Sequence, residues 1–302
     1  MSDWFERVEN DSSNVVYSRV RLSRNWDEYA FPSRLMDRES RELVVRLEQG
    51  IQGLGSLDGH RYESAFLSQL RDLDKEALKE RRILNSSIAQ RRSPTGLVIS
   101  DDESASLVLN GEDHIRMQFL APGLALRECW QRADKLDDYI NERFSYAFDD
   151  KYGYLTTYPT NMGTGMKASV VIHMPTLSTS RKFNELLGEM SRFGTTVRGV
   201  YGQGSENYGA LYEIYNQKTL GQSEQEIIDL VEKVALQLTG QENQVRKKAL
   251  ENHRLIREDE IYKSYGVLKY ARRLTMKDAM TFLSQIMAGF ADGLIEGEKP
   301  CH

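Results

Sequence analysis

Two arginines on alternate residues of one short segment could together bind an anion. The segment reads Ser18-Arg-Val-Arg-Leu-Ser-Arg24, and an extended chain puts Arg19 and Arg21 on the same face. Their guanidinium groups repel each other unless an anion lies between them, and phosphate suits because the planar fork of arginine binds it with two hydrogen bonds. A solvated edge strand with surface arginines is the other interpretation, and the segment alone does not decide between them.

Three further segments combine polar side chains with turns or glycines. Asn110-Gly-Glu-Asp-His-Ile-Arg116 gathers two carboxylates, an imidazole and a guanidinium, although a polar turn explains it equally well. Two glycine-rich segments allow backbone N–H groups to approach a ligand closely: Tyr158-Pro-Thr-Asn-Met-Gly-Thr-Gly-Met-Lys167 and Arg198-Gly-Val-Tyr-Gly-Gln-Gly-Ser-Glu206. The first of them lacks the spacing of a Walker A loop, and each could be a plain turn.

Other common kinds of active site find no support in the sequence. The histidines lie outside the motifs of serine hydrolases and zinc proteases, and His173 fits a packed or hydrogen-bonded histidine inside a strand better than a base. Cys129 and Cys301 are far apart, and no cysteine–histidine cluster accompanies them. We therefore expect neither a metal site nor a disulfide, and a reducing cytoplasm is the expected location.

Apolar patterns predict the elements that position these segments. Short apolar runs predict strands at 97–99, 106–109, 115–119 and 168–174. Spaced apolar residues predict helices at 62–82 and 124–143. After Gly221 the pattern is helical: Ser223 begins a helix with a capping box, Gly240 is expected to interrupt it, a charged helix follows over 241–265, and Thr275 caps the last helix.

The composition is that of an ordinary globular protein. The chain has 302 residues, enough for about two domains of roughly 150 residues each. Lys and Arg number 40 against 45 Asp and Glu, and the net charge of −5 argues against a protein that coats nucleic acid. No apolar run reaches the roughly 18–20 residues of a membrane helix, and the N-terminus lacks the pattern of a signal peptide.

Taken together, the segments resemble the ATP:guanido phosphotransferase family, and within it the bacterial protein-arginine kinase branch. The family's motifs are matched in order and spacing by Ser18-Arg-Val-Arg-Leu-Ser-Arg-Asn25, Glu112-Asp-His-Ile-Arg116, Pro159-Thr-Asn-Met-Gly-Thr-Gly165 with Ala168-Ser-Val170, Arg198-Gly-Val-Tyr-Gly202 and Asn216-Gln-Lys-Thr-Leu-Gly221. The resemblance covers residues 12–295. The metabolic creatine and arginine kinases carry a helical domain before the first motif, which here begins at residue 18 and so favours the protein kinase branch.

The resemblance implies a fold and an activity. Residues 12–221 are expected to form the α+β catalytic fold of guanido kinases, an antiparallel sheet flanked by helices. Residues 222–302 are expected to form an all-helical C-terminal region, shortened relative to the protein-arginine kinases. The implied activity is transfer of the γ-phosphate of ATP, with Mg²⁺, to arginine side chains of proteins. The implied partners are substrate proteins with exposed arginines, an unfoldase–protease system, a small zinc-binding activator and, as a possibility left open, a second copy of the chain, but neither nucleic acid nor membrane.

The resemblance also assigns roles to residues. Five basic residues match those that hold the nucleotide phosphates: Arg19, Arg21, Arg116, Lys167 and Arg198. Glu112 matches the catalytic glutamate and Gln203 a second acceptor-binding position, while Tyr158 and Asn161 belong to the substrate loop. The other positions implied to bind ATP are Ser18, Val20, Leu22, Ala168, Ser169, Val170, Val171, Gly199, Val200, Tyr201 and Gly202.

Several residues depart from the family pattern, mostly on the acceptor side. Gly111 replaces an acidic residue, Tyr158 a reactive cysteine, and Gln203 a glutamate; Lys167 replaces an arginine and Arg82 a histidine that contacts the nucleotide. Loss of one charged contact to a transition state commonly lowers a rate about 10²–10³-fold. Two hypotheses therefore stay open: a protein-arginine kinase with a partly altered acceptor site, and an inactive pseudokinase that acts as a nucleotide-binding or adaptor module in protein quality control.

Overall fold

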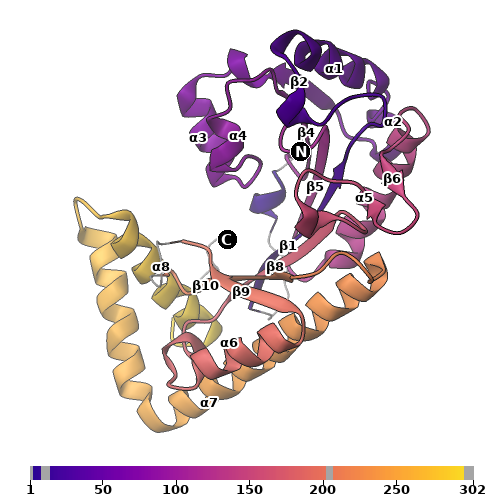
Figure 1. Cartoon of the computed structure of the whole chain (residues 1–302). Coiled ribbons are helices and arrows are strands. Elements are labelled where there is room, and N and C mark those ends of the chain that lie inside the picture. Colours follow the sequence, from indigo (N-terminus) through magenta and orange to yellow (C-terminus); the bar gives the residue numbers. More distant parts are fainter. Residues whose placement is uncertain (1–2, 8–13, 202–206, 296–302) are drawn as a thin grey trace.

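The fold centres on one antiparallel sheet. The computed structural model describes residues 3–7, 14–201 and 207–295, and within them the sheet strands run in the order β2-β3-β4-β5-β1-β8-β10-β9 (Figure 1). Their bounds are β1 Val15–Arg24, β2 Tyr62–Phe66, β3 Gly96–Ser100, β4 Ala105–Leu109, β5 Ile115–Pro122, β8 Met166–His173, β9 Thr195–Gly199 and β10 Leu211–Asn216. A separate ribbon pairs β6 (Phe148–Asp149) with β7 (Gly153–Tyr154).

Helices pack against both faces of this sheet. They are α1 Asp37–Gly50, α2 Gly55–Asp58, α3 Asp72–Glu80, α4 Ser86–Ala89, α5 Leu126–Asn141, α6 Phe183–Arg192, α7 Glu224–Tyr270 and α8 Met276–Ala291. Short 3-10 turns lie at Trp4–Glu6 (η1), Pro32–Arg34, Leu67–Gln69, Pro159–Asn161 and Leu177–Thr179. Among the described residues, none of the helices combines the length and apolar character needed to cross a membrane.

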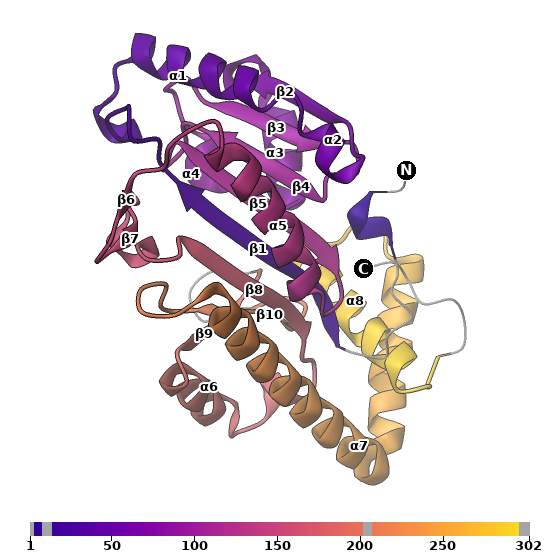
Figure 2. The same ribbon diagram turned by 90° about the vertical axis from the view of Figure 1, so that its right-hand side faces the viewer.

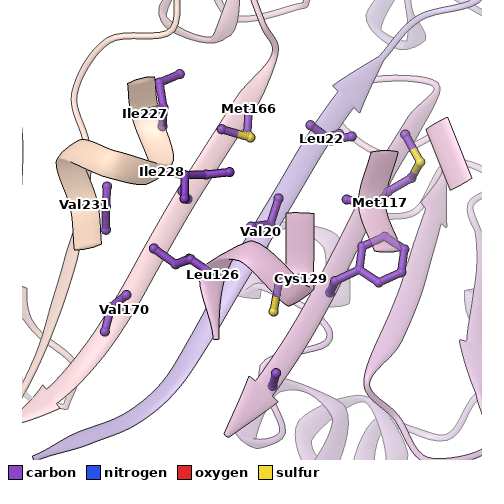
Figure 3. Packing of buried hydrophobic residues seen from close by; sticks show 14 of the residues in the cluster. Val20, Leu22, Met117, Leu126, Cys129, Met166, Val170, Ile227, Ile228 and Val231 are labelled. Carbon is purple, nitrogen blue, oxygen red and sulfur yellow. The ribbon is translucent and has the colours of Figure 1, made fainter. Parts of the chain in front are cut away.

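One face of the sheet is apolar and carries the main core. Alternation along β1 points Val20 and Leu22 to this face, where both are fully buried. Helices α5 and α7 lie across it (Figure 2). Figure 3 shows the core residues that the two helices and the central strands contribute, among them Met117, Leu126, Cys129, Met166, Val170, Ile227, Ile228 and Val231. The buried thiol of Cys129 is free.

The opposite face has a polar centre between two apolar ends. A small cluster that includes Ile83, Ile88, Leu97 and Val108 covers the β3–β4 end beneath α3 and α4. Trp4 of η1 packs with Tyr17, Leu120 and Val171 at the other end. The arginines of the first motif lie between these two ends. Because side chains alternate between the two faces of a strand, the charged residues lie on one face of the sheet and the core residues on the other.

Most predicted elements are confirmed, and two predictions are wrong. The predicted strands and the helix at 124–143 are present, and Ser223 and Thr275 accept backbone N–H bonds at their helix starts. The helix expected at 62–82 begins as an edge strand, β2, because pairing with β3 outweighs its charged sequence. Gly240 does not interrupt α7. The non-helical residue is His253, and both halves of α7 pack on their surroundings, which outweighs the low helix propensity of one glycine.

The core face predicts a large cost for truncating a central residue. Replacing Leu22→Ala should lower the free energy of unfolding by about 2–5 kcal/mol, since its side chain is fully buried between sheet and helices. Leu73→Ala is the matched control, because Leu73 is 73% exposed. Urea denaturation of both variants measures the difference. Equal losses in the two variants would contradict the burial of Leu22 in the core.

Candidate functional site

Five cationic side chains gather on the polar face, and we call them the cationic cluster: Arg19, Arg21, Arg116, Lys167 and Arg198. Strand register brings them together, because directly paired residues of antiparallel strands share a face. Arg21 pairs with Lys167, and Ser23, two residues further along β1, pairs with Arg116. Arg198 on β9 pairs with Glu213 on β10. All five phosphate-binding residues expected from the sequence thus share one face.

Glu213 is the carboxylate that holds two of these cations. Its Oε1 accepts from Arg19 Nη2, and its Oε2 accepts from Arg198 Nε and Nη2 at 3.0 and 2.7 Å. Glu213 is buried, which raises its pKa, but the charges of Arg19 and Arg198 outweigh burial and hold the pKa well below its usual range. Arg19 also donates to Ser169 Oγ at 3.3 Å. Glu213 therefore stays ionised and fixes both guanidinium groups.

Among the described residues, Arg21 and Lys167 form no ion pair, and the ion pair of Arg116 with Glu112 is longer, at 3.5 Å. Burial and the neighbouring charges of Arg19 and Arg116 lower the pKa of Arg21 to about 9. Burial also lowers the pKa of Arg116, whose Nε is buried and has no hydrogen-bond partner among the described residues. Burial, with Arg21 beside it, lowers the pKa of Lys167 to about 8, and its Nζ lies 3.9 Å from the ring centre of Tyr215. These three side chains form a desolvated positive site suited to a polyanion.

An apolar cavity of about 460 Å³ adjoins the cluster at the Arg19 end. It begins at Tyr17, the next residue of β1 on this face, and at Val171, the register partner of Tyr17 on β8. Val200 and Tyr201, which follow β9, also line it. The volume is typical of a small-molecule site. One continuous strip of the sheet thus offers an apolar compartment beside a polycationic one.

Glu112 lies at the other end of the cluster, in the β4–β5 connection. Its Oε2 is 3.5 Å from Arg116 Nη1, and its Oε1 accepts from Asn85 Nδ2 at 3.2 Å. The side chain remains 23% exposed, so the carboxylate borders both the cations and solvent. Thr157 Oγ1 donates to the carbonyl of Glu112 at 2.7 Å, which ties the substrate-loop segment to this connection. The strip therefore ends in a carboxylate.

The rest of the Glu112 connection is structural. Asp113 Oδ1 accepts from Asn25 Nδ2 at 2.8 Å and from the Thr157 N–H at 2.7 Å. His114 Nδ1 accepts from the Trp26 N–H, so its ring is neutral, and burial lowers its pKa. These bonds explain why two carboxylates and an imidazole occur so close together: one carboxylate faces the site, and the other groups brace its loop.

Contacts within the protein fix the conformation of segment 158–165, which contains the expected substrate-loop residues. A Cβ on Gly165, whose φ is +62°, would lie 2.7 Å from the Ser23 carbonyl, so glycine is required here for packing rather than for approach to a ligand. Thr219 donates from Oγ1 to the carbonyls of Thr160 and Met162 at 3.0 and 2.5 Å. The motif at 216–221 therefore supports this loop.

The two substrate-loop residues expected from the sequence lie apart. Tyr158 follows Thr157 and is 52% exposed, beside the Glu112 connection. Asn161 lines a polar cavity of about 150 Å³ together with Lys167 and Tyr215. Tyr158 thus borders the carboxylate end of the strip, whereas Asn161 borders the lysine.

Several of the expected strand residues do not join the cluster. Strand alternation turns their side chains to the apolar face, where each is fully buried: Ser18, Val20, Leu22, Ala168 and Val170. Ser18 Oγ, for example, donates to the Gly123 carbonyl and accepts the Ala125 N–H at the start of α5. Their side chains serve the core. Gly202 and Gln203 lie outside the described residues, and Gly199 is exposed at the end of β9.

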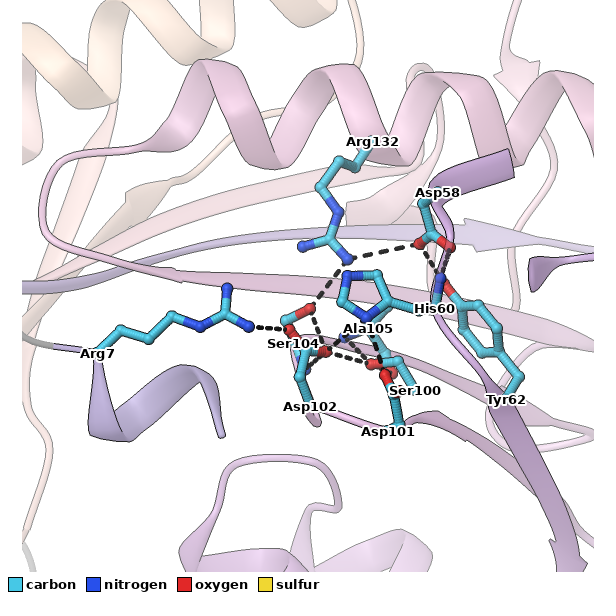
Figure 4. Close-up of polar contacts among 10 residues, drawn as sticks. All are labelled: Arg7, Asp58, His60, Tyr62, Ser100, Asp101, Asp102, Ser104, Ala105 and Arg132. Atoms are coloured by element: carbon cyan, nitrogen blue, oxygen red, sulfur yellow. Dashed lines mark hydrogen bonds and ion pairs between the residues drawn. The ribbon is translucent and has the colours of Figure 1, made fainter. Parts of the chain in front are cut away.

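A second cluster of titratable side chains, formed by His60, Asp101 and Asp102, lies at the β3–β4 turn (Figure 4). His60 Nδ1 is 2.9 Å from Asp101 Oδ1 and 3.6 Å from Asp102 Oδ1, a spacing that could hold a metal ion. However, Asp102 Oδ1 already accepts from the Ser100 hydroxyl and from both the backbone and the hydroxyl of Ser104. Because these donors compete with a cation, we assign the group a structural role.

That role is to anchor η1 over the apolar cavity. Arg7 Nη2 donates to Asp102 Oδ2 at 2.7 Å, and the Trp4 N–H donates to the Asp102 carbonyl at 3.0 Å. Trp4 and Phe5 line the cavity. The turn shown in Figure 4 thus helps to shape the apolar compartment from outside the sheet.

Comparison with known proteins shows the family to which the chain belongs. Residues 48–245 match the family model of the ATP:guanido phosphotransferase C-terminal catalytic domain. Residues 255–301 match that of the protein-arginine kinase McsB C-terminal domain. The chain is 37% identical over 303 residues to the protein-arginine kinase of Bacillus subtilis (strain 168), covering 98% of this chain and 82% of the relative. The chain belongs to the ATP:guanido phosphotransferase family, in its protein-arginine kinase branch. It is therefore a phosphotransferase enzyme by descent.

A further relative supports the assignment of the family, and solved structures support the fold. The protein-arginine kinase of Caldanaerobacter subterraneus is 36% identical over 288 residues, 95% of this chain and 86% of the relative. Among solved structures, lombricine kinase matches with a TM-score of 0.69 and 22% identity over 80% of this chain and 68% of that chain. A duplicated taurocyamine kinase from Schistosoma mansoni matches with a TM-score of 0.69 and 20% identity, covering 91% and 43%. These structures confirm the expected guanido-kinase fold.

Sequence reasoning missed two residues of this candidate site, Glu213 and Tyr215. Both lie on β10, in Leu211-Tyr-Glu-Ile-Tyr-Asn216, which no motif covered. The sequence pattern that could have indicated Glu213 is a single acidic residue on the polar face of a strand, whose side chains alternate between the two faces of the sheet. Its partners could not be read from that signal, because Arg19 is 194 positions away and reaches Glu213 across β8.

Removing the charge of Glu213 should destabilise the free enzyme. Glu213→Gln leaves Arg19 buried without a counter-ion, and the free energy of unfolding should fall by about 3–5 kcal/mol. Tripolyphosphate should recover part of this loss, because an anion replaces the missing charge. Glu258→Gln removes an exposed ion pair with Arg254 and is the control. Urea denaturation with and without the anion tests this; equal losses in the two variants would contradict it.

Lys167 should make anion binding depend on pH. Its pKa of about 8 means that it is charged below pH 8 and loses its proton above it, before Arg21, whose pKa is about 9. Above pH 8, binding of tripolyphosphate must take up a proton, so affinity should fall by up to about tenfold per pH unit. Lys167→Arg should remove this fall. Calorimetric titration between about pH 7 and 8.5, below the pKa of Arg21, measures both proteins, and identical profiles would rule out the assignment.

Proposed function

We propose that this chain is a protein-arginine kinase that transfers the γ-phosphate of ATP to arginine side chains of proteins. The carrying observation is the order of compartments along one sheet face. The apolar cavity at Tyr17 comes first, the cationic cluster follows, and Glu112 comes last. This order matches the parts of the reaction: a nucleoside, a triphosphate and an acceptor. It orients the γ-phosphate towards Arg116 and Glu112.

Glu112 has the properties that a guanidinium acceptor requires. Such a group has a pKa above about 12 and is protonated, so it attacks phosphorus poorly until a carboxylate orients it and takes a proton. Glu112 is partly exposed, and its Oε2 lies 3.5 Å from Arg116. We assign it the role of base. Arg116 and Lys167 stabilise charge on the transferred group from fixed positions, which is the main contribution a protein makes to phosphoryl transfer.

The residues present also fit Mg²⁺. This ion is usually held by substrate phosphates and waters with one or two carboxylates. Glu112 is a partly exposed carboxylate at the phosphate end, whereas both oxygens of Glu213 are taken by arginines. Glu112 would therefore face a nucleotide-bound ion, which, when present, neutralises charge on the phosphates.

The altered residues on the acceptor side support a second candidate function, that of a pseudokinase. A Cβ on Gly111 would lie 3.0 Å from Ile88 Cδ1 and from Val108 Cγ1, so the acidic side chain common in the family would meet an apolar wall here. Tyr158, by contrast, is exposed, and its replacement by cysteine needs no repacking. Reverting Tyr158 and Gln203 therefore tests lost catalysis better than reverting Gly111.

The activity is tested with γ-labelled MgATP and histone as a basic acceptor. Wild type should transfer label that is acid-labile and alkali-stable, because phosphoarginine has that chemistry. Glu112→Gln keeps the shape of the side chain but removes the base, and should lower the rate by about 10²–10⁴-fold. Glu63→Gln, on the exposed surface of edge strand β2, is the control and should label at the wild-type rate.

Other results have definite meanings. ATP binding without transfer by the wild type would favour the pseudokinase, and the double change Tyr158→Cys with Gln203→Glu should then create labelling. An unlabelled histone and no ATP binding would overturn both candidates. With kinase activity, the proposed partners are proteins with exposed arginines, an unfoldase–protease system that reads phosphoarginine and a zinc-binding activator in the cytoplasm; a second copy of the chain is a further proposed partner.

A further inference from the structure

The apolar cavity has a wall that does not belong to the catalytic sheet. Helix α8 contributes Met280, Leu283 and Met287 to its lining, which also includes Tyr17 and Val171. Figure 1 shows α8 returning from the far end of the α7 arm towards the sheet. The compartment that adjoins the cationic cluster is therefore closed by an element more than 100 residues away in the chain from either strand.

Contacts at His173 and Gly209 help to attach α8 to the catalytic sheet. His173 Nε2, at the end of β8, lies 2.7 Å from Ser284 Oγ on α8. A Cβ on Gly209, just before β10, would lie 3.0 Å from Met280 Cε, so glycine lets this connection approach the helix closely. The position of α8 thus affects both the cavity and the start of β10.

A buried carboxylate fixes the position of α8. The side chain of Asp292, which follows α8, is fully buried: its Oδ1 accepts from Arg246 at 2.9 and 2.7 Å, and its Oδ2 accepts from Arg257 at 3.1 and 2.5 Å. The two arginines lie on either side of His253, where α7 bends with φ −138° and ψ 30°. Asp292 therefore locks the angle of the bend and the return of α8 together.

We propose that α8 forms the far wall of the pocket for the nucleoside of ATP, and that Asp292 is a positioning residue that sets nucleotide affinity by holding this wall. The inference rests on the proposed function, because it takes ATP as the ligand of the strip. It makes the C-terminal helices part of nucleotide binding. Affinity and docking of α8 are then coupled, and each must favour the other.

Two probes separate the wall from the phosphate site: MgATP occupies both compartments, and inorganic tripolyphosphate occupies the cationic cluster alone. Asp292→Asn removes the charge shared by the two arginines and should weaken MgATP binding about tenfold, with tripolyphosphate affinity changed less than about twofold. Asp259→Asn removes an exposed ion pair with Lys263 on the same arm and should change neither. Isothermal titration calorimetry on the full chain measures all four affinities.

A second pair of variants tests the wall without disturbing the buried carboxylate. Met287→Ala shortens a residue that lines the cavity and should weaken MgATP binding about fivefold, leaving tripolyphosphate unaffected. Met276→Ala makes the same change at a 62% exposed position on the same helix and outside the lining, and should have no effect. Neither change removes a buried charge, so this pair still tests the wall if Asp292→Asn fails to fold.

Each outcome of these titrations either supports or contradicts the inference. Unchanged MgATP affinity in both Asp292→Asn and Met287→Ala overturns the inference. A parallel loss of MgATP and tripolyphosphate binding also overturns it, because the effect would then come from the cluster or from general destabilisation. A wild type that binds tripolyphosphate but not MgATP refutes the proposed function and the inference together, and it does so before any variant is measured.

Discussion

The crowding of like charges on one sheet face is the constraint on which the structure depends. Arg19, Arg21 and Lys167 lie on neighbouring strands with Glu213 as the buried carboxylate among them. Depressed pKa values at Arg21 and Lys167 show that charging this face is unfavourable in the free chain. A polyanion offsets that cost, so the strip is less stable empty than occupied. The large apolar core on the opposite face supplies the stability that an unfavourable site requires.

The same alternation explains what could be predicted from the sequence. Arg19 and Arg21 were placed together by period two, and the Ser223 and Thr275 caps by their residue patterns. Contiguous motifs, however, assigned Val20 and Leu22 to the ligand, although period two puts them in the core. A motif is a run of neighbours in the chain, whereas a sheet face takes every second residue from several strands.

What could not be predicted depends on contacts between distant segments. Glu213 gains its role from the register of three strands, and β2 is a strand only because β3 pairs with it. The two halves of α7 meet at His253 rather than at Gly240, because Asp292 fixes the bend through arginines from both halves. Such features follow from tertiary structure, which local propensity does not contain.

The site divides into a part built on strands and a part built on loops, and this division bears on its altered residues. The cationic side chains lie on paired strands. A shift in strand register would move them to the other face and expose the core residues to solvent. Glu112 and Tyr158 lie on connections that are braced by Asp113 and Thr157. Substitutions such as that at Tyr158 can therefore alter the acceptor chemistry without disturbing the sheet. A chain can keep the phosphate half of this fold intact while its acceptor half diverges.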